Sequence, residues 1–479
     1  MSMERRTVLK SGAAALLGGP FAGFAASSAS GVSHAAAGSS TTLVPIKDER
    51  DGVVRLHLPE GFRYRSFHDT TEKVVLRDKT VLPGRHDGMG AFRGDGGSVV
   101  LVRNHEVNGS PGRFGHGPVY DQAAGGGTTT VHVTKHGEVL DSYTSLSGTM
   151  MNCSGGIMPW GSWITCEETV NGPDVAPDFT GASNTGLEKP HGYIFEVPVE
   201  GRSGHQPITR AGRFAHEAVS FDPVGGSLYL TEDNFAFASG FYRYTPRRNP
   251  MAAGRLDNDG VLEMLAVKGQ PNKHLEGAQE QGVTYEVEWV AIDEPDFLFD
   301  YEKGEEAPTS NDEAIVFVGN QGRAKGAAYF SRLEGQVYDD GVVYFTSTQG
   351  GGAPEDGTHD PAGYGNGFGQ VWGYDTHNET LTCVYQSPDQ ATLDFPDNVT
   401  VSPRGTLVLC EDSSGDNYLR GLTPDGRLWD IALNRIAGRH GDEFAGSTFS
   451  TDGHTLFVNI QSSKGMTFAI WGPWASIGV

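Results

Sequence analysis

Hydrophobic and polar residues alternate along most of this chain in short runs, with Gly- and Pro-rich segments between them. Alternation with a period of two predicts β-strands that have one buried face. Helical periodicity is confined to the N-terminal segment and to residues 266–281. The pattern therefore predicts an all-β protein. The alternating runs occupy 99–102, 128–133, 193–197, 241–244, 287–292, 314–318, 342–345, 371–374, 406–409, 455–460 and 468–471.

One module recurs along the chain, in which acidic residues flank a strand, a tight turn and a second strand. Its clearest copies occupy 215–234, 396–412 and 442–461, and looser copies occupy 331–348, 151–168 and 86–106. Repeats of this kind predict the blades of a β-propeller around a central metal site. Six blades are favoured by the starting points, near 87, 153, 217, 334, 397 and 443. Seven blades are the alternative, because the interval after the third copy is long enough to hide another.

The N-terminal segment differs from the rest of the chain. Arg5 and Arg6 precede an apolar stretch that resembles a twin-arginine export signal, and a small-residue cleavage site follows near Ala37. Glycine and proline interrupt that stretch, so we expect no stable membrane insertion. The alternative to an export signal is a disordered tail with a chance arginine pair. We expect a monomer in the periplasm or outside the cell, exported by the twin-arginine machinery. The predicted domains are a signal at 1–37, a polar leader at 38–52 and one propeller at 53–479 with an insertion around 246–312.

The chain is strongly acidic, with 60 acidic and 36 basic residues and a net charge of −24. Nucleic acid is excluded as an expected partner, because binding it requires a basic surface. The acidity either keeps the surface solvated or includes carboxylates that bind cations. Among the four cysteines, Cys166, Cys383 and Cys410 lie in predicted strands and are expected to pack as small hydrophobic residues. Cys153 is expected in a loop, where other copies of the module carry Glu or Asp.

Most copies of the module carry an acidic residue at the same place in their first strand. The matched residues are Glu217, Glu334, Asp397 and, as a thiol among carboxylates, Cys153. The sixth copy has Ala445 there, with Glu443 two residues earlier, and Asp87 of the first copy is one residue out of register. Because the innermost strands of a propeller line its channel, these side chains should ring one mouth. The far end of the module adds a second column, Glu106, Glu168, Asp233 and Asp412.

Carboxylates held this close together raise each other's pKa unless a cation lies between them. Oxygen ligands suit calcium, whereas a thiolate suits a softer metal such as iron or zinc. The alternative is that these carboxylates only accept hydrogen bonds from turn N–H groups. The expected metal ligands are Cys153, Glu217, Glu334, Asp397, Glu106, Glu168 and Asp412.

Arg332 lies two residues before Glu334, so the two side chains are expected to share a strand face. A guanidinium beside a ring of metals can bond phosphate oxygens, which makes Arg332 the candidate catalytic and phosphate-binding residue. The alternative is a salt bridge to a neighbouring acid. Asn104 and Asn152 are candidate substrate-binding amides. The nearby imidazoles are either ligands or hydrogen-bonded structural groups, namely His105 and His216.

At these residues the chain resembles the PhoX-type alkaline phosphatases. The resemblance runs from about residue 86 to the closing W-G-P-W at 471–474, and N-C-S-G-G and S-T-F-S-T-D-G are its most specific segments. The other matching stretches are R-N-H-E, W-G-S-W-I-T-C-E-E, H-G-Y-I-F-E-V, G-R-F-A-H-E-A-V, S-R-L-E-G and D-N-V-T-V-S-P-R-G. The chain is compact for this family, so its substrate pocket is expected to lack some loops.

The resemblance implies an exported six-bladed propeller that hydrolyses phosphate monoesters. It implies a central cluster of Fe³⁺ and Ca²⁺ with Cys153 as a ligand, carboxylate ligands that include Glu217 and Glu334, and phosphate bound by Arg332. The expected reaction is attack on small phosphorylated substrates by a metal-bound oxo or hydroxo group, as in a phosphoric monoester hydrolase. The alternatives are a calcium-dependent propeller lactonase or esterase, which would not need Cys153, and a non-catalytic secreted propeller stapled by metals.

Overall fold

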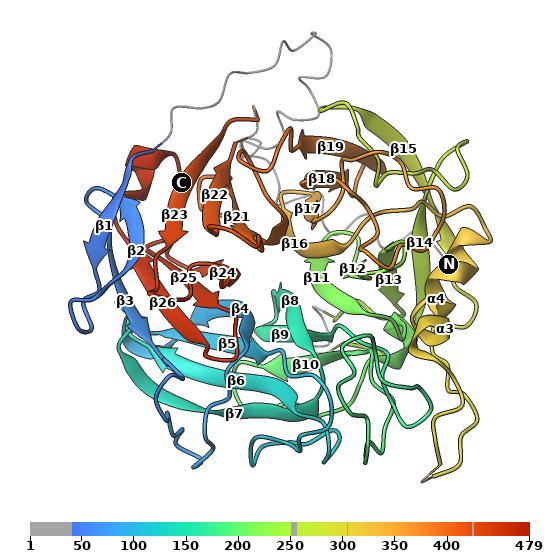
Figure 1. Cartoon of the computed structure of the whole chain (residues 1–479), viewed down its shortest axis with the longest axis horizontal. Helices are drawn as coiled ribbons and strands as arrows, with labels where there is room; N and C mark the ends of the chain where they lie inside the picture. Colours follow the sequence, from blue (N-terminus) through green and yellow to red (C-terminus); the bar gives the residue numbers. More distant parts are fainter. Residues whose placement is uncertain (1–40, 251–255, 304, 424–425) are drawn as a thin grey trace.

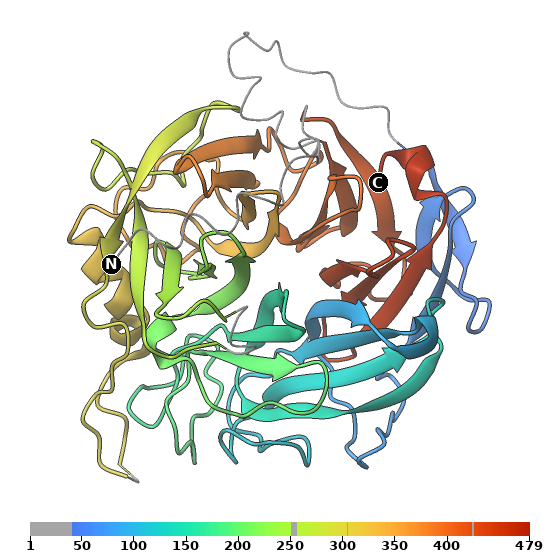
Figure 2. The same ribbon diagram turned by 180° about the vertical axis from the view of Figure 1, so that it is seen from behind.

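A computed structural model of the chain describes residues 41–250, 256–303, 305–423 and 426–479, and its sheets are arranged in a ring around a central space (Figures 1 and 2). The all-β propeller prediction is confirmed. The predicted export signal lies outside the described residues. Within the described part of the chain, no helix has the length and apolarity needed to span a bilayer.

Six strands form the inner wall of the ring. They are β4 (His86–Arg93), β8 (Asn152–Met158), β11 (His216–Asp222), β16 (Leu333–Asp339), β20 (Pro396–Val401) and β24 (Phe444–Phe449). Each of these strands packs against the next, and β24 packs against β4, so the ring closes. The inner strands begin within one residue of the positions at which the module was predicted to start.

Each inner strand begins an antiparallel sheet that extends outwards. β4 is followed by β5 (Val99–His105), β6 (Gly126–Val133) and β7 (Val139–Thr149), and β8 is followed by β9 (Ser162–Glu167) and β10 (Ile194–Pro198). β20 is followed by β21 (Leu407–Glu411), β22 (Tyr418–Leu422) and β23 (Leu428–Asn434), and β24 is followed by β25 (Thr455–Ile460) and β26 (Met466–Trp471).

The remaining two inner strands belong to one nine-stranded sheet, with β11 at one edge and β16 at the other. From β11 it continues through β12 (Ser227–Glu232), β13 (Phe241–Pro246), β14 (Gly260–Val267) and β15 (Thr284–Ala291). From β16 it continues through β17 (Val342–Ser347), β18 (Gln370–Asp375) and β19 (Thr380–Gln386). β15 pairs with β19, so two blades are joined at their outer edges. The predicted insertion around 246–312 therefore supplies the two outer strands β14 and β15.

Helices are few in the described residues, and one of them corrects a prediction. The run at 314–318 was expected to be a strand but lies in the helices α3 (Asn311–Ile315) and α4 (Phe317–Arg323). The reason is local: Ser310 and Glu313 form a capping box, which stabilises a helix start. Residues 266–281 are the end of β14 and a loop rather than a helix. Short 3₁₀ turns occupy η2 (Asp95–Gly97), η3 (Thr209–Ala211) and η4 (Trp474–Ile477).

The N-terminal strands complete two of the sheets. β3 (Arg63–Phe67) pairs with β26, and β1 (Leu43–Lys47) and β2 (Val54–Pro59) extend the sheet beyond β23. Part of the predicted polar leader is therefore the edge strand β1. Leu58 and Tyr64 from this region lie in one buried cluster with Val408 and Leu456, so apolar burial holds the start of the chain against its end.

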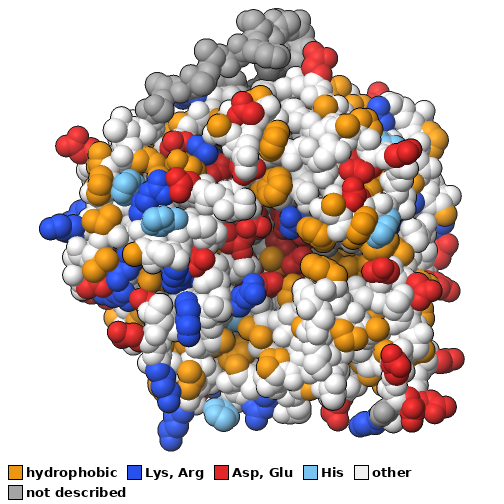
Figure 3. Space-filling model, viewed as in Figure 1, with side chains coloured by type: hydrophobic (Ala, Val, Ile, Leu, Met, Phe, Trp, Pro, Cys, Tyr) orange, Lys and Arg blue, Asp and Glu red, His pale blue; other side chains and the backbone are white. Residues whose placement is uncertain are grey.

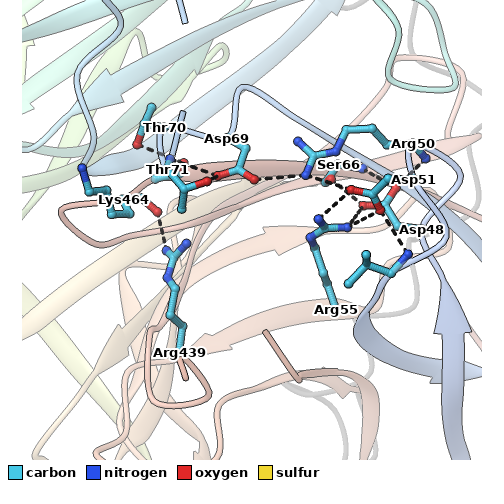
Figure 4. A network of polar contacts seen from close by, with 12 residues as sticks. Asp48, Arg50, Asp51, Arg55, Ser66, Asp69, Thr70, Thr71, Arg439 and Lys464 are labelled. Atoms are coloured by element: carbon cyan, nitrogen blue, oxygen red, sulfur yellow. Dashed lines mark hydrogen bonds and ion pairs between the residues drawn. The ribbon is translucent and has the colours of Figure 1, made fainter. Parts of the chain in front are cut away.

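A polar network beside these strands fixes the β1–β2 connection (Figure 4). Asp48 is 2% exposed and accepts hydrogen bonds from Arg55 at 2.8 Å and from the Ser66 hydroxyl at 2.5 Å. Arg55 also forms two hydrogen bonds to Asp51, each of 2.7 Å. Each of these carboxylates is therefore satisfied by a guanidinium or hydroxyl group of the protein itself.

Candidate metal centre

A β-bulge interrupts all six inner strands at the same place. In each strand the pairing with its neighbour slips by one residue near the start, for example between His216 and Val219 in β11. An extra residue in a bulge re-aims the side chains around it. The first bulged residues are Asp87, Cys153, Glu217, Glu334, Asp397 and Gly446.

This register corrects three details of the sequence alignment. Asp87 is in register with the other ring residues. Gly446, not Ala445, occupies the sixth place, at a φ of 59° that favours glycine. A Cβ there would lie 2.3 Å from the Asp87 carbonyl oxygen, so the site accepts only glycine without a shift. Cys153 lies in strand β8 rather than in a loop.

Seven side chains near the mouth form three adjoining groups that could each hold a cation. Within each group the ligand atoms all lie within 4.8 Å of one another. Glu217 belongs to the first and second groups and Asp397 to the second and third, so the groups form a continuous chain. The groups are Cys153–Glu168–Glu217, Glu217–Glu334–Asp397 and Asp397–Asp412–Glu443. Acidic side chains visibly line the central hollow of this face (Figure 3).

These carboxylates lack enough partners in the protein. Glu217 is fully buried, and among the described residues neither of its carboxylate oxygens has a hydrogen-bonding partner apart from the Cys153 thiol. Burial, and then the charges of Asp397 and Asp87, raise its pKa well above the usual value. Burial and Asp412 likewise raise the pKa of Asp397 to about 7. A bound cation would supply the missing compensation.

The donor atoms fit both kinds of metal that the sequence predicted. The first group combines the Cys153 thiol with two carboxylates, a set that suits a borderline metal such as iron. The other two groups contain only carboxylate oxygens, which suit calcium. Burial, followed by the charges of Asp87 and Glu217, raises the pKa of the Cys153 thiol, so a metal is needed to hold it as a thiolate.

Paired acids at the ends of β9, β12 and β21 have two different roles. The first acid of each pair faces into the fold and accepts hydrogen bonds from a neighbouring loop. Glu167 accepts the backbone N–H of Gly192 at 2.8 Å, and Glu232 accepts that of Gly240 at 2.9 Å. Glu411 accepts the backbone N–H of Asp394 at 3.1 Å. The second acids are the ones near the mouth, namely Glu168, Asp233 and Asp412.

Arg332 lies among these acids, immediately before β16. Its Nη2 donates to Asp233 and to Glu334, both at 2.8 Å, and its Nε also faces Asp233. Its positive φ of 37° is shared by Arg85, Met151 and Phe395 at the same place in other blades, so this backbone conformation belongs to the repeated module. Among the described residues its Nη1 has no protein partner, so this nitrogen is free to donate to a ligand.

Glu106 stands apart from the three ligand groups. It accepts a hydrogen bond of 3.1 Å from Arg85, which occupies in the first blade the place that Arg332 has in the fourth. Burial raises the pKa of Glu106 to about 7 although Arg85 opposes the shift. Its role as a metal ligand stays a prediction. Asp87 and Glu443 also lie in the ring. The sequence analysis placed both acids near the site but did not assign them as metal ligands.

The two predicted substrate-binding amides form hydrogen bonds inside the protein. Asn104 is fully buried; its amide donates to the carbonyls of Cys153 and Ser154 at 3.0 and 2.7 Å and accepts from Trp163 at 2.9 Å. It therefore holds the β8 bulge in place. Asn152 is also fully buried and bonds Thr149 and Thr165. These bonds give both amides a structural role, and substrate binding by either of them stays a prediction.

The two histidines near the site are hydrogen-bonded inside the protein. His105 contacts the Gly84 carbonyl and the Thr129 hydroxyl, each at 3.0 Å. His216 contacts the Gly212 carbonyl at 2.9 Å and stacks on Phe214. Neither belongs to a ligand group among the described residues, which favours the structural interpretation.

Fold and site together define a β-propeller whose channel mouth brings carboxylates together with the Cys153 thiol and the Arg332 guanidinium. The sequence profile described as alkaline phosphatase PhoX matches residues 41–142 and 138–464, which is most of the chain. The chain therefore belongs to the PhoX alkaline phosphatase family, and the resemblance seen in the sequence is confirmed. A search of curated protein sequences finds no match.

Solved structures of similar fold include Pseudomonas fluorescens PhoX in complex with vanadate, a transition state analogue. Its TM-score is 0.63 at 17% identity, with 91% of this chain and 98% of that chain covered. A gluconolactonase from Xanthomonas campestris matches with a TM-score of 0.40 at 12% identity, covering 90% of this chain and 98% of that chain. A virginiamycin B lyase from Staphylococcus aureus scores 0.39 at 11% identity, with coverage of 86% and 99%.

Proposed function

We propose that this protein is an exported, cation-dependent phosphatase that hydrolyses phosphate monoesters. Family membership supports phosphatase activity. The observation that carries the proposal is the placement of Arg332 against Glu334, a member of the central ligand group. A phosphate group needs positive charge from several directions, and an acidic mouth can supply it only through bound cations and this guanidinium. The vanadate complex of P. fluorescens PhoX is consistent with such a site.

The ligand groups suggest which residues would hold which metal. Cys153, with Glu168 and Glu217, would hold Fe³⁺, and the all-carboxylate groups around Asp397 would hold Ca²⁺. When bound, the cations would supply Lewis-acid stabilisation of the phosphate oxygens and an activated water as nucleophile. The calcium-only lactonase alternative gives no role to Cys153.

Arg332 would bind and orient the phosphate. Its ion pairs with Asp233 and Glu334 fix the guanidinium plane before substrate arrives, and Nη1 remains to donate to a phosphate oxygen. Burial opposes the charge on Arg332, but the charges of Asp233 and Glu334 raise its pKa, so it stays a cation throughout the working range. A fixed positive charge can then stabilise the charge that develops during phosphoryl transfer.

The central test compares two arginines at equivalent places. We expect Arg332→Ala to lose about 10²–10³ in turnover of an aryl phosphate while keeping its metals, by analogy with the loss of an oxyanion donor. Arg332→Lys should recover only part of this turnover, because lysine cannot form the bidentate ion pair with Asp233. Arg85→Ala is the matched control and should change turnover far less. Unchanged turnover in Arg332→Ala would remove this residue from the site.

Elemental analysis of protein purified without chelator tests the metal assignment. Iron together with calcium supports the phosphatase, whereas calcium alone favours the lactonase or the stapled propeller. Absence of both metals would refute the cation-dependent proposal.

Export is tested separately by cell fractionation of a variant with Arg5→Lys and Arg6→Lys. This variant should remain in the cytoplasm if the twin-arginine prediction is right.

A further inference from the structure

Two stacked phenylalanine rings lead away from Arg332. The ring of Phe235, two residues after Asp233, lies 5.7 Å from the Arg332 guanidinium carbon. Phe179 stacks on Phe235, with ring centroids 5.3 Å apart and planes at 21°. The stack therefore leads outwards from the arginine that is proposed to bind phosphate. Hydrophobic side chains border the acidic hollow on this face of the molecule (Figure 3).

Phe179 is the more unusual of the two rings. It is 80% exposed, although an aromatic side chain gains most from burial. Its loop is nevertheless anchored by the neighbouring Asp178, which accepts hydrogen bonds from Asn108 at 2.8 Å and from Asn171 at 3.3 Å. One face of the ring lies on Phe235, and the exposure leaves the other side open to a ligand. A single exposed apolar residue is ordinary, but this ring is held in place and turns a flat aromatic face to the solvent.

We propose that Phe179 and Phe235 form a subsite for a planar aromatic group on the ester side of the substrate. This inference rests on the proposed function, since it places the phosphate at Arg332 and the ring of the same molecule against the phenylalanine stack. The preferred substrates are then phosphate monoesters that carry an aromatic ring, either an aryl ester or a nucleotide. Simple alkyl phosphates would use only the phosphate contacts. Stacking recognises the flat face of the ring and tolerates different ring chemistries.

Phosphonates separate binding from hydrolysis, because their carbon–phosphorus bond is not cleaved. Binding of phenylphosphonate, methylphosphonate and a nucleoside phosphonate is measured by calorimetry on the metal-loaded protein as purified. We expect Phe179→Ala to weaken phenylphosphonate or nucleoside phosphonate by about threefold to tenfold, the range of an aromatic pair, and to leave methylphosphonate unchanged. Phe179→Tyr should bind like the wild type, and Phe179→Leu like the alanine variant.

Val224→Ala is the matched control. Val224 is 79% exposed but lies in the turn between β11 and β12, beyond the end of β11 that is opposite Glu217. It should change none of the affinities. If Phe179→Ala weakens the binding of phenylphosphonate, the subsite is assigned to aryl esters. If it weakens only the binding of the nucleoside phosphonate, the subsite is assigned to nucleobases. If Phe179→Ala weakens all three ligands equally, or none of them, the subsite is refuted.

Hydrolysis distinguishes failure of this inference from failure of the proposed function. A metal-loaded protein that cleaves neither phenyl phosphate nor glycerol phosphate refutes the phosphatase, while the phosphonate affinities still report on the stack. If both esters are cleaved, the ratio of their kcat/KM values should fall in Phe179→Ala by the same threefold to tenfold seen in binding. An unchanged ratio in an active variant argues against the subsite alone.

Discussion

Around Asp48 the carboxylates face arginines, whereas of the seven acidic or thiol groups at the channel mouth only Glu334 is paired with an arginine among the described residues. The pKa values move in opposite directions. The hydrogen bonds from Arg55 hold the pKa of Asp51 well below its usual value, while burial raises that of Glu217. The charges of the first cluster are compensated by the protein itself, whereas those of the second would need bound cations for compensation. The same residue types thus support stability in one region and form the proposed ligand site in the other.

Removing a carboxylate shared by two ligand groups should have the largest effect. We expect Glu217→Gln to lose metal and more than about a hundredfold in turnover, because metal catalysis supplies several kcal/mol of transition-state stabilisation. After chelation the same variant should be more stable than the wild type, because an uncompensated buried charge has gone. Urea unfolding with and without chelator shows whether Glu217→Gln is more or less stable than the wild type. If the variant is less stable in both conditions, the contrast between the two regions is wrong.

The thiol sharpens the comparison within the mouth. Cys153→Ser should lose iron and most activity while staying folded, because serine binds borderline metals less well than a thiolate. Cys410 is fully buried in strand β21 outside the ligand groups, so Cys410→Ser should lower stability and leave the metal content unchanged. Metal analysis and thermal unfolding of both variants decide this. Full iron content in Cys153→Ser would show that the thiol is not a ligand.

The Asp48 cluster should respond in the opposite manner. Asp48→Asn weakens the contacts to Arg55 and Ser66 inside the β1–β3 region, and we expect the free energy of unfolding to fall by about 2–3 kcal/mol. The loss should be equal with and without chelator. A chelator-dependent loss would mean that the two regions are energetically coupled.

An effect of similar size that depends on pH is expected at His191, a buried cation behind the mouth. Burial lowers its pKa, but the charges and hydrogen bonds of Glu167 and Asp121 prevail and raise it to about 9. Its other neighbours are the Tyr120 ring and Arg213, which donates to the His191 carbonyl.

Because the folded pKa exceeds the unfolded value of 6.5, the stabilisation is complete below about pH 6.5 and is lost as pH rises through about 9. Up to about 3 kcal/mol should disappear over this window. Urea unfolding at several pH values should show it in the wild type, and His191→Gln should flatten the profile. A wild-type profile that is already flat would contradict the assigned cation.

The sequence predicted the propeller and most residues of the three candidate ligand groups, because one module repeats with its chemistry intact. Its acidic first strand located Glu217, Glu334 and Asp397 without any knowledge of the fold. The bulge was invisible, because an extra residue at a strand start does not disturb the alternation that follows. Asp87 was therefore placed out of register, and Ala445 was matched where Gly446 stands.

The polar residues beside the ring were harder to assign. Asn104 and Glu167 both lie one or two residues from a mouth acid, yet both are fully buried and bond only protein groups. Strand alternation breaks down at a strand end, so sequence spacing cannot tell which neighbour turns inwards. The family resemblance implied which metals to expect and a phosphate-binding role for Arg332. It did not imply the separate roles of the two acids in each pair.

The pairing of β3 with β26 joins residues from almost opposite ends of the chain. During synthesis, β3 leaves the ribosome early and must wait, with an unpaired edge, until the last sheet has been made. Contacts so distant in sequence form slowly, and unpaired strand edges invite association with other chains. A nascent or C-terminally truncated protein would thus be the form most in need of a chaperone, even though the closed ring leaves few edges exposed.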